Sequence, residues 1–127
     1  MKVSKISAVT LLVSDMKMSV NFYSKIPNFK IVYGGPEAQF TSFLIDDTVK
    51  SYLNLKLNET HSTDFGRIIF YTDDVDDLFT YMQDDKTVSE LGKFESKPQD
   101  AIWGERFFHM LDPDGYKLSF ATPLGNE

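Results

Sequence analysis

Two apolar runs, each followed by a helical pattern, open the two halves of this chain. The first run covers residues 6–13 and the second covers residues 65–72. Behind each run stands an aspartate, Asp15 or Asp74, which begins a stretch of mainly apolar positions at i, i+3, i+4 and i+7. That spacing favours an amphipathic helix, and aspartate is a good N-cap residue. The two aspartates are 59 positions apart (74 − 15), so the chain contains a weak internal repeat.

Strand-like segments follow each predicted helix, the first of which is expected to end at Pro27. The predicted strands are Phe29–Tyr33, Gln39–Asp46 and Ser51–Leu57 in the first half, and Lys93–Lys97, Glu105–Leu111 and Tyr116–Thr122 in the second. Within Ser51–Leu57, apolar and polar residues alternate, which is typical of a strand with one apolar face. The pattern therefore predicts the order βαβββ twice, with polar residues 58–64 as the linker.

The segment Asp112–Gly115 has the sequence DPDG and gives the strongest turn signal. Asp, Pro and Gly at these positions favour a type I turn closed by a left-handed glycine, as in a three-residue hairpin loop with a bulge. Such a hairpin pairs Asp112 with Tyr116 and places His109 opposite Ser119. A slip of one residue would turn His109 to the other face of the sheet.

Composition limits the chemistry that is available to the chain. The 127 residues are 42% hydrophobic and 25% charged, which indicates a globular protein. There is no cysteine, so disulfides, thiolate metal sites and cysteine nucleophiles are excluded. The two histidines, His61 and His109, are too few for a multi-histidine metal site. We expect His61, in the polar linker, to be solvated.

The charge balance bears on partners and location. A net charge of −6 argues against nucleic acid, whose affinity rests on lysine and arginine, and mildly favours cationic ligands. No apolar run approaches the roughly 18 residues that span a bilayer. We therefore expect a cytoplasmic protein without a signal peptide and without nucleic-acid or membrane partners.

Two longer motifs resemble a known family. Residues 9–29 (VTLLVSDMKMSVNFYSKIPNF) are similar to the opening strand and helix of the vicinal oxygen chelate superfamily, and residues 103–123 (WGERFFHMLDPDGYKLSFATP) to its closing hairpin. This superfamily includes glyoxalase I, extradiol dioxygenases, and fosfomycin and bleomycin resistance proteins. The resemblance implies an α+β fold in one domain, residues 1–127. Its two βαβββ modules (module one 1–60, module two 61–127) form a curled mixed β-sheet groove with helices outside, and many members are homodimers.

The resemblance also locates the positions at which enzymatic members hold a metal ion. They lie on the first and last strands of each module and correspond here to Ala8, Asn54, Arg67 and Ser119. Alanine has no donor atom, and arginine is permanently cationic. Asparagine and serine are weak neutral oxygen donors, adequate only beside carboxylates. The sequence therefore predicts no metal site and no cofactor.

The predicted ligand-binding residues combine one cation with aromatic and polar side chains. They are Tyr52, Asn54, Arg67, Tyr71, Trp103, His109 and Ser119. Arg67 could bind a carboxylate, phosphate or enolate-like oxygen, or instead pair with a nearby acid. Trp103 could stack on a planar ligand, or instead pack at the rim or in a dimer contact. His109 is the candidate catalytic residue, although it could equally be a half-buried histidine bonded to a neighbour.

Three functions remain open on this basis. The first is a metal-independent small-molecule binding protein of the glyoxalase/bleomycin resistance type, a homodimer holding a planar or aromatic ligand in the groove. The alternative is a glyoxalase-related lyase or isomerase that uses His109 as base and Arg67 as stabiliser of an enediolate-like oxygen. The third is a dimerisation module whose groove is filled by its own side chains.

Overall fold

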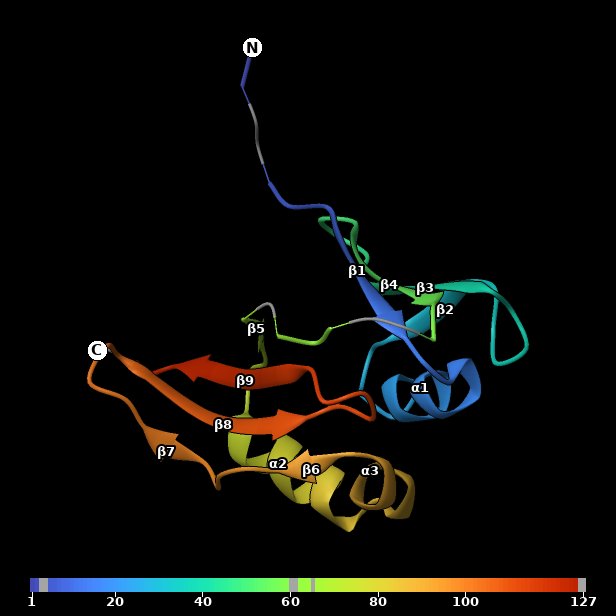
Figure 1. Ribbon diagram of the computed structural model, residues 1–127. Helices are drawn as coiled ribbons and strands as arrows, with labels where there is room; N and C mark the ends of the chain where they lie inside the picture. The colour runs from blue at the N-terminus through green and yellow to red at the C-terminus, as the bar shows by residue number, and fades with distance from the viewer. Residues whose placement is uncertain (3–4, 60–61, 65, 126–127) are drawn as a thin grey trace. The chain divides into compact units, whose positions relative to one another are not determined.

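The computed structural model describes residues 1–2, 5–59, 62–64 and 66–125 (Figure 1). The chain forms two compact units, Met1–His61 and Ser62–Glu127. The boundary between them in the sequence falls inside the predicted linker, residues 58–64. His61 lies outside the described residues. Each unit holds one mixed β-sheet with helices, so the predicted α+β class is confirmed. That both modules belong to a single domain stays a prediction.

The first unit contains one helix and four strands. They are β1 (Ala8–Val13), α1 (Met16–Tyr23), β2 (Lys30–Tyr33), β3 (Phe40–Asp46) and β4 (Ser51–Leu57). The sheet has the order β1-β4-β3-β2, in which β1 runs parallel to β4 and the other neighbours are antiparallel. The unit therefore has the predicted βαβββ order, and its first strand, β1, pairs with its last strand, β4.

The second unit repeats this topology with two additions. Its elements are β5 (Arg67–Tyr71), α2 (Val75–Asp84), α3 (Lys86–Leu91), β6 (Lys93–Phe94), β7 (Gln99–Asp100), β8 (Glu105–Leu111) and β9 (Lys117–Pro123). The strand order is β5-β9-β8-β6, with β7 also paired to β8. Because the first, fourth, third and second main strands follow one another in both sheets, the internal repeat predicted from the sequence is confirmed.

Both predicted N-caps are present. The Asp15 carboxylate accepts from the Met18 amide at 3.0 Å, and the Asp74 carboxylate accepts from the Asp77 amide at 3.0 Å. The predicted end of the first helix at Pro27 is wrong, because α1 ends at Tyr23. The Lys25 and Ile26 amides bond three residues back instead of four, which tightens the chain into turns before the proline is reached.

The segment between α2 and β8 differs most from the prediction. Helix α3 was not predicted, although the Asp85 side chain caps it and Val88 anchors it in the core with no exposure. Strand β6 stops at Phe94 instead of Lys97. The Glu95 and Ser96 amides both point at one acceptor on the neighbouring strand, the His109 carbonyl, so the regular ladder ends there.

The core of the second unit lies between its sheet and α2, which Figure 1 shows against β8 and β9. Alternate residues of the strands point into it. The buried side chains of this core are Leu78, Phe79, Met82, Val88, Phe108, Met110, Leu118 and Phe120. The rings of Phe79 and Phe108 meet edge to face, with centroids 5.1 Å apart. The opposite face of this sheet carries the other half of the strand residues, and among the described residues of this unit no helix packs on it.

The DPDG hairpin has the predicted register. The Asp112 amide donates to the Tyr116 carbonyl at 3.0 Å, and Gly115 takes the left-handed conformation with φ 97°. The Asp112 carboxylate is buried and accepts from the Asp114 and Tyr116 amides, both at 2.9 Å. His109 therefore pairs with Ser119 across β8 and β9, as predicted.

Candidate functional site

The face of the second sheet opposite α2, called here the open face, carries most of the predicted site residues. The strand register aligns Ile69, Ser119 and His109 in one row across β5, β9 and β8. The next row contains Tyr71, Ala121 and Phe107. Because side chains alternate along a strand, Arg67 and Glu105 point to this same face. The sheet register therefore brings the strand residues of the open face together.

A polar network joins three of the predicted residues on the open face. Arg67 Nη1 donates to Ser119 Oγ at 3.1 Å and to the Leu118 carbonyl at 2.9 Å. Ser119 Oγ lies 2.7 Å from His109 Nδ1, and only 2% of Ser119 is exposed. Glu95 Oε1 is 3.7 Å from Arg67 Nη2, a longer and weaker ion pair. The sequence placed Arg67, Ser119 and His109 together correctly, but it did not predict Glu95 as a neighbour.

The surroundings of His109 favour its neutral form. Burial lowers the pKa of His109 below its ordinary value, and the positive charge of Arg67 lowers it further, whereas Glu95 acts in the opposite direction. A guanidinium group can only donate, so Ser119 Oγ accepts from Arg67 and can give its own proton to His109 Nδ1. In that arrangement the Nε2 of His109 carries the ring proton and is a hydrogen-bond donor.

The first prediction concerns this pKa. In an NMR pH titration, we expect His109 to titrate below 6.5, and Arg67→Ala to raise its midpoint because a nearby positive charge is removed. The unfolded chain takes up this proton near its ordinary pKa. The contribution of His109 to stability is therefore fully present above about pH 6.5 and is lost as the pH falls towards the lower folded pKa.

A matched control for that titration is Lys86→Ala, which removes a positive charge from an exposed residue of α3. It should leave the His109 midpoint unchanged, and His61→Gln identifies which imidazole signal belongs to His109. A midpoint at or above 6.5 in the unmodified protein would contradict the proposed surroundings of His109.

An aromatic group continues the open face beyond this network. Trp103 Nε1 donates to Glu105 Oε1 at 3.0 Å, and the Tyr71 hydroxyl donates to Glu105 Oε2. The Trp103 ring stacks on Phe107 with centroids 5.9 Å apart, and Phe107 lies 4.7 Å from the His109 ring. Glu105 and Phe107 were not predicted as site residues. Counting back from His109 along the strand in steps of two residues would have found both, first Phe107 and then Glu105.

Tyr52 and Asn54 belong to the first unit and lie on its sheet. Asn54 is aligned with Thr10 and Ser42 on the neighbouring strands. Its amide donates to Thr10 Oγ1 at 3.3 Å and accepts from Ser42 Oγ at 2.7 Å. Tyr52 is aligned with Ala8, two residues away along each strand. The seven predicted residues thus form two groups, two residues in the first unit and five in the second.

The four positions that correspond to metal ligands do not fit a divalent cation. Ala8 has no donor atom, and the Asn54 amide is hydrogen-bonded by two hydroxyl groups. Ser119 Oγ accepts from the guanidinium of Arg67, whose charge repels a cation. In the part of the chain that the structure describes, no three His, Asp or Glu side chains gather as metal ligands.

The repeated strand order and the paired polar positions on each sheet define a protein of the glyoxalase type. The chain belongs to the glyoxalase/bleomycin resistance protein/dioxygenase superfamily, whose family model matches residues 5–120. This confirms the resemblance found in the sequence. No curated protein matches the chain. Among the described residues, no helix is long and apolar enough to cross a membrane.

Several solved structures share the fold. A glyoxalase-related enzyme from Fulvimarina pelagi has a TM-score of 0.74 at 15% identity, covering 98% of this chain and 94% of its own. The fosfomycin resistance protein FosX from Listeria monocytogenes has a TM-score of 0.71 at 17% identity, covering 95% and 94%. TioX from Micromonospora sp. ML1 has a TM-score of 0.68 at 19% identity, covering 95% and 100%. At these identities the likeness extends to the fold alone.

Proposed function

We propose that this protein binds a small planar or aromatic molecule without a metal ion, and that the ligand rests on the open face of the second sheet. The observation that carries the proposal is the place of Arg67, whose charged group is bonded to Ser119 on the same face of the sheet that carries the exposed side chains of Tyr71 and Trp103. A fixed cation surrounded by apolar surface and a few polar points is the usual make-up of a small-molecule site.

The bonds of Arg67 leave its charge available to a ligand. Two of its partners, the Leu118 carbonyl and Ser119 Oγ, are neutral oxygens that hold the guanidinium in position. Its acidic partner, Glu95, lies 3.7 Å away with 36% of its side chain exposed, and exposed ion pairs are weak. A ligand carboxylate that approaches in the plane of the guanidinium can displace Glu95 and form two parallel hydrogen bonds.

Exposed apolar side chains share this face with Arg67. Ile69 is 57% exposed, Tyr71 65% and Trp103 68%, whereas large apolar side chains are usually buried. Their neighbours fix them in place: Tyr71 and Trp103 are both hydrogen-bonded to Glu105. Rings that are held rigidly and left exposed lose little conformational entropy when a planar ligand stacks on them.

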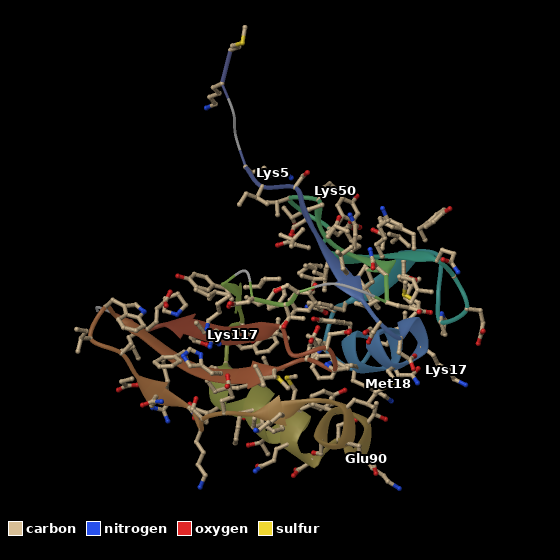
Figure 2. All side chains as sticks on the ribbon, viewed as in Figure 1. Lys5, Lys17, Met18, Lys50, Glu90 and Lys117 are labelled. Atoms are coloured by element: carbon tan, nitrogen blue, oxygen red, sulfur yellow. The ribbon has the colours of Figure 1, made fainter. Side chains whose placement is uncertain are left out.

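The test is a binding screen with Arg67→Ala. We expect an aromatic carboxylate such as naphthoate to raise the melting temperature, and Arg67→Ala to weaken its affinity at least about tenfold, as for a lost charge-assisted hydrogen bond. The matched control is Lys17→Ala on exposed residue 17 of α1 (Figure 2), which removes the same charge and should leave affinity unchanged.

Two outcomes would contradict the proposal. If Arg67→Ala strongly destabilises the protein, Arg67 is a structural residue. If the purified protein contains stoichiometric zinc, nickel, iron or manganese by mass spectrometry, binding is not metal-independent. The homodimer stays a prediction that rests on the family resemblance, and the cytoplasmic location stays a prediction from the sequence.

One observation favours the enzymatic alternative, a lyase or isomerase with His109 as base and Arg67 as oxyanion stabiliser. The lowered pKa keeps His109 in its basic, neutral form near pH 7, and Arg67 is close enough to lower that pKa. The Ser119 hydroxyl, however, already contacts Nδ1, so proton abstraction would need an unprotonated Nε2. The enzyme is favoured if His109→Ala abolishes turnover and keeps ligand binding. A complete absence of ligands in the screen favours the dimerisation module instead.

A further inference from the structure

Glu105 lies between two exposed aromatic rings on the open face and has an unusual set of partners. One oxygen of its carboxylate accepts from Trp103 Nε1 and the other from the Tyr71 hydroxyl. Both donors are neutral. Among the residues that the structure describes, no lysine, arginine or histidine pairs with this carboxylate. The negative charge of Glu105 is therefore held in position by hydrogen bonds but is not neutralised.

The cationic residue nearest to Glu105 in the sequence, Arg106, forms ion pairs with other carboxylates. Arg106 follows Glu105 but points to the other side of the strand, where it pairs with Asp76 at 2.9 Å and Asp100 at 3.0 Å. Glu105 also raises the pKa of Tyr71 through their hydrogen bond, so the phenol keeps its proton and does not add a second negative charge. One net negative charge thus remains beside two rings.

The backbone holds the tryptophan of this cluster in place. Gly104 has φ 92°, a conformation that lets the chain turn between Ala101 and Glu105. The Ala101 amide donates to the Glu105 carbonyl at 2.7 Å, and the Leu124 amide donates to the Gly104 carbonyl at 2.9 Å. With Phe107 stacked against it and 68% of Trp103 exposed, the indole has ring surface left for a ligand.

We propose that Tyr71, Trp103 and Glu105 form a subsite for an organic cation, namely an alkylated or aromatic ammonium group of the bound small molecule. A soft cation gains from the faces of tryptophan and tyrosine rings and from a nearby carboxylate together. A fully hydrated metal ion or a lysine-like ammonium fits less well, because the rings cannot replace its water. The proposal rests on the proposed function, since it names the chemical class of one part of the ligand.

The chain offers a direct readout, because Trp103 is its single tryptophan. Titration with benzyltrimethylammonium should change the Trp103 fluorescence in a saturable way. Its neutral analogue of similar shape, neopentylbenzene, should bind at least about tenfold more weakly. Glu105→Gln keeps an oxygen acceptor and removes the charge, so it should abolish the preference for the cation over the neutral probe.

The matched control is Glu90→Gln, which makes the same charge change on exposed α3, where Figure 2 shows the side chain pointing away from the sheet. It should keep the preference for the cation. If the neutral probe binds as well as the cation, or if Glu105→Gln keeps the preference, the cation subsite is wrong while the binding face stands. If neither probe changes the fluorescence, the subsite is also wrong, and the naphthoate screen with Arg67→Ala decides separately whether the face binds ligands.

Discussion

Replacing Phe108 with alanine should lower the free energy of unfolding by about 3–5 kcal/mol, the usual range for a large ring removed from a core. Phe108 has no exposed surface, and its ring meets Phe79, Phe94 and Phe120 at centroid distances of 5.1, 6.1 and 5.3 Å. The residual cavity lies between the sheet and α2, where neighbouring rings cannot easily close it. Urea denaturation measures the change as a lower midpoint at constant slope.

The adjacent residue provides the control. Phe107 points to the open face, where its ring contacts Trp103 and His109 instead of the core. Phe107→Ala should cost about 1 kcal/mol, close to the average substitution, while it removes the surface on which Trp103 stacks. If the two variants are equally destabilised, the division of this sheet into a helix-covered face and an open face is wrong.

The sequence predicted the parts of this fold that depend on local periodicity. The N-caps Asp15 and Asp74 and the DPDG hairpin each need only a few neighbouring residues, and all are present as predicted. The hairpin also fixed the register of β8 and β9, and hence the pairing of His109 with Ser119. These features follow from side-chain oxygens and glycine conformations that act within one turn of chain.

The features that the sequence did not predict depend on contacts between distant segments. Strand β6 is short because two amides share the His109 carbonyl, an acceptor that lies more than ten residues away. Likewise, the partner of Trp103 and Tyr71 is Glu105, whose role depends on bringing β5 and β8 to one face. The sequence therefore predicted residues of the candidate site, but it did not predict the place of Glu105 among them, because that place depends on the fold.

A second large effect is expected in the first unit, where Gly34→Ala should lower the free energy of unfolding by at least about 3 kcal/mol. Gly34 has φ 78°, a conformation that costs other residues about 1–2 kcal/mol. An added Cβ would also lie 2.1 Å from the Phe40 carbonyl oxygen, so the backbone must move. That movement would disturb Thr41, whose buried hydroxyl accepts from the Gly35 amide at 3.1 Å and donates to the Gly35 carbonyl at 3.0 Å.

The control is Gly104→Ala, at φ 92° with no atom within 4 Å of the added Cβ, which should cost only the backbone strain of about 1–2 kcal/mol.

Gly34→Ala also tests whether residues 1–127 form one domain. Each unit has only about 60 residues, a size at which a lone core is marginal, so we expect both to unfold in one transition. Trp103, in the second unit, then reports a lower urea midpoint for Gly34→Ala, coincident with the loss of far-UV circular dichroism. If the Trp103 midpoint stays unchanged while the circular dichroism shows an earlier phase, the two units fold independently, and the single-domain prediction is wrong.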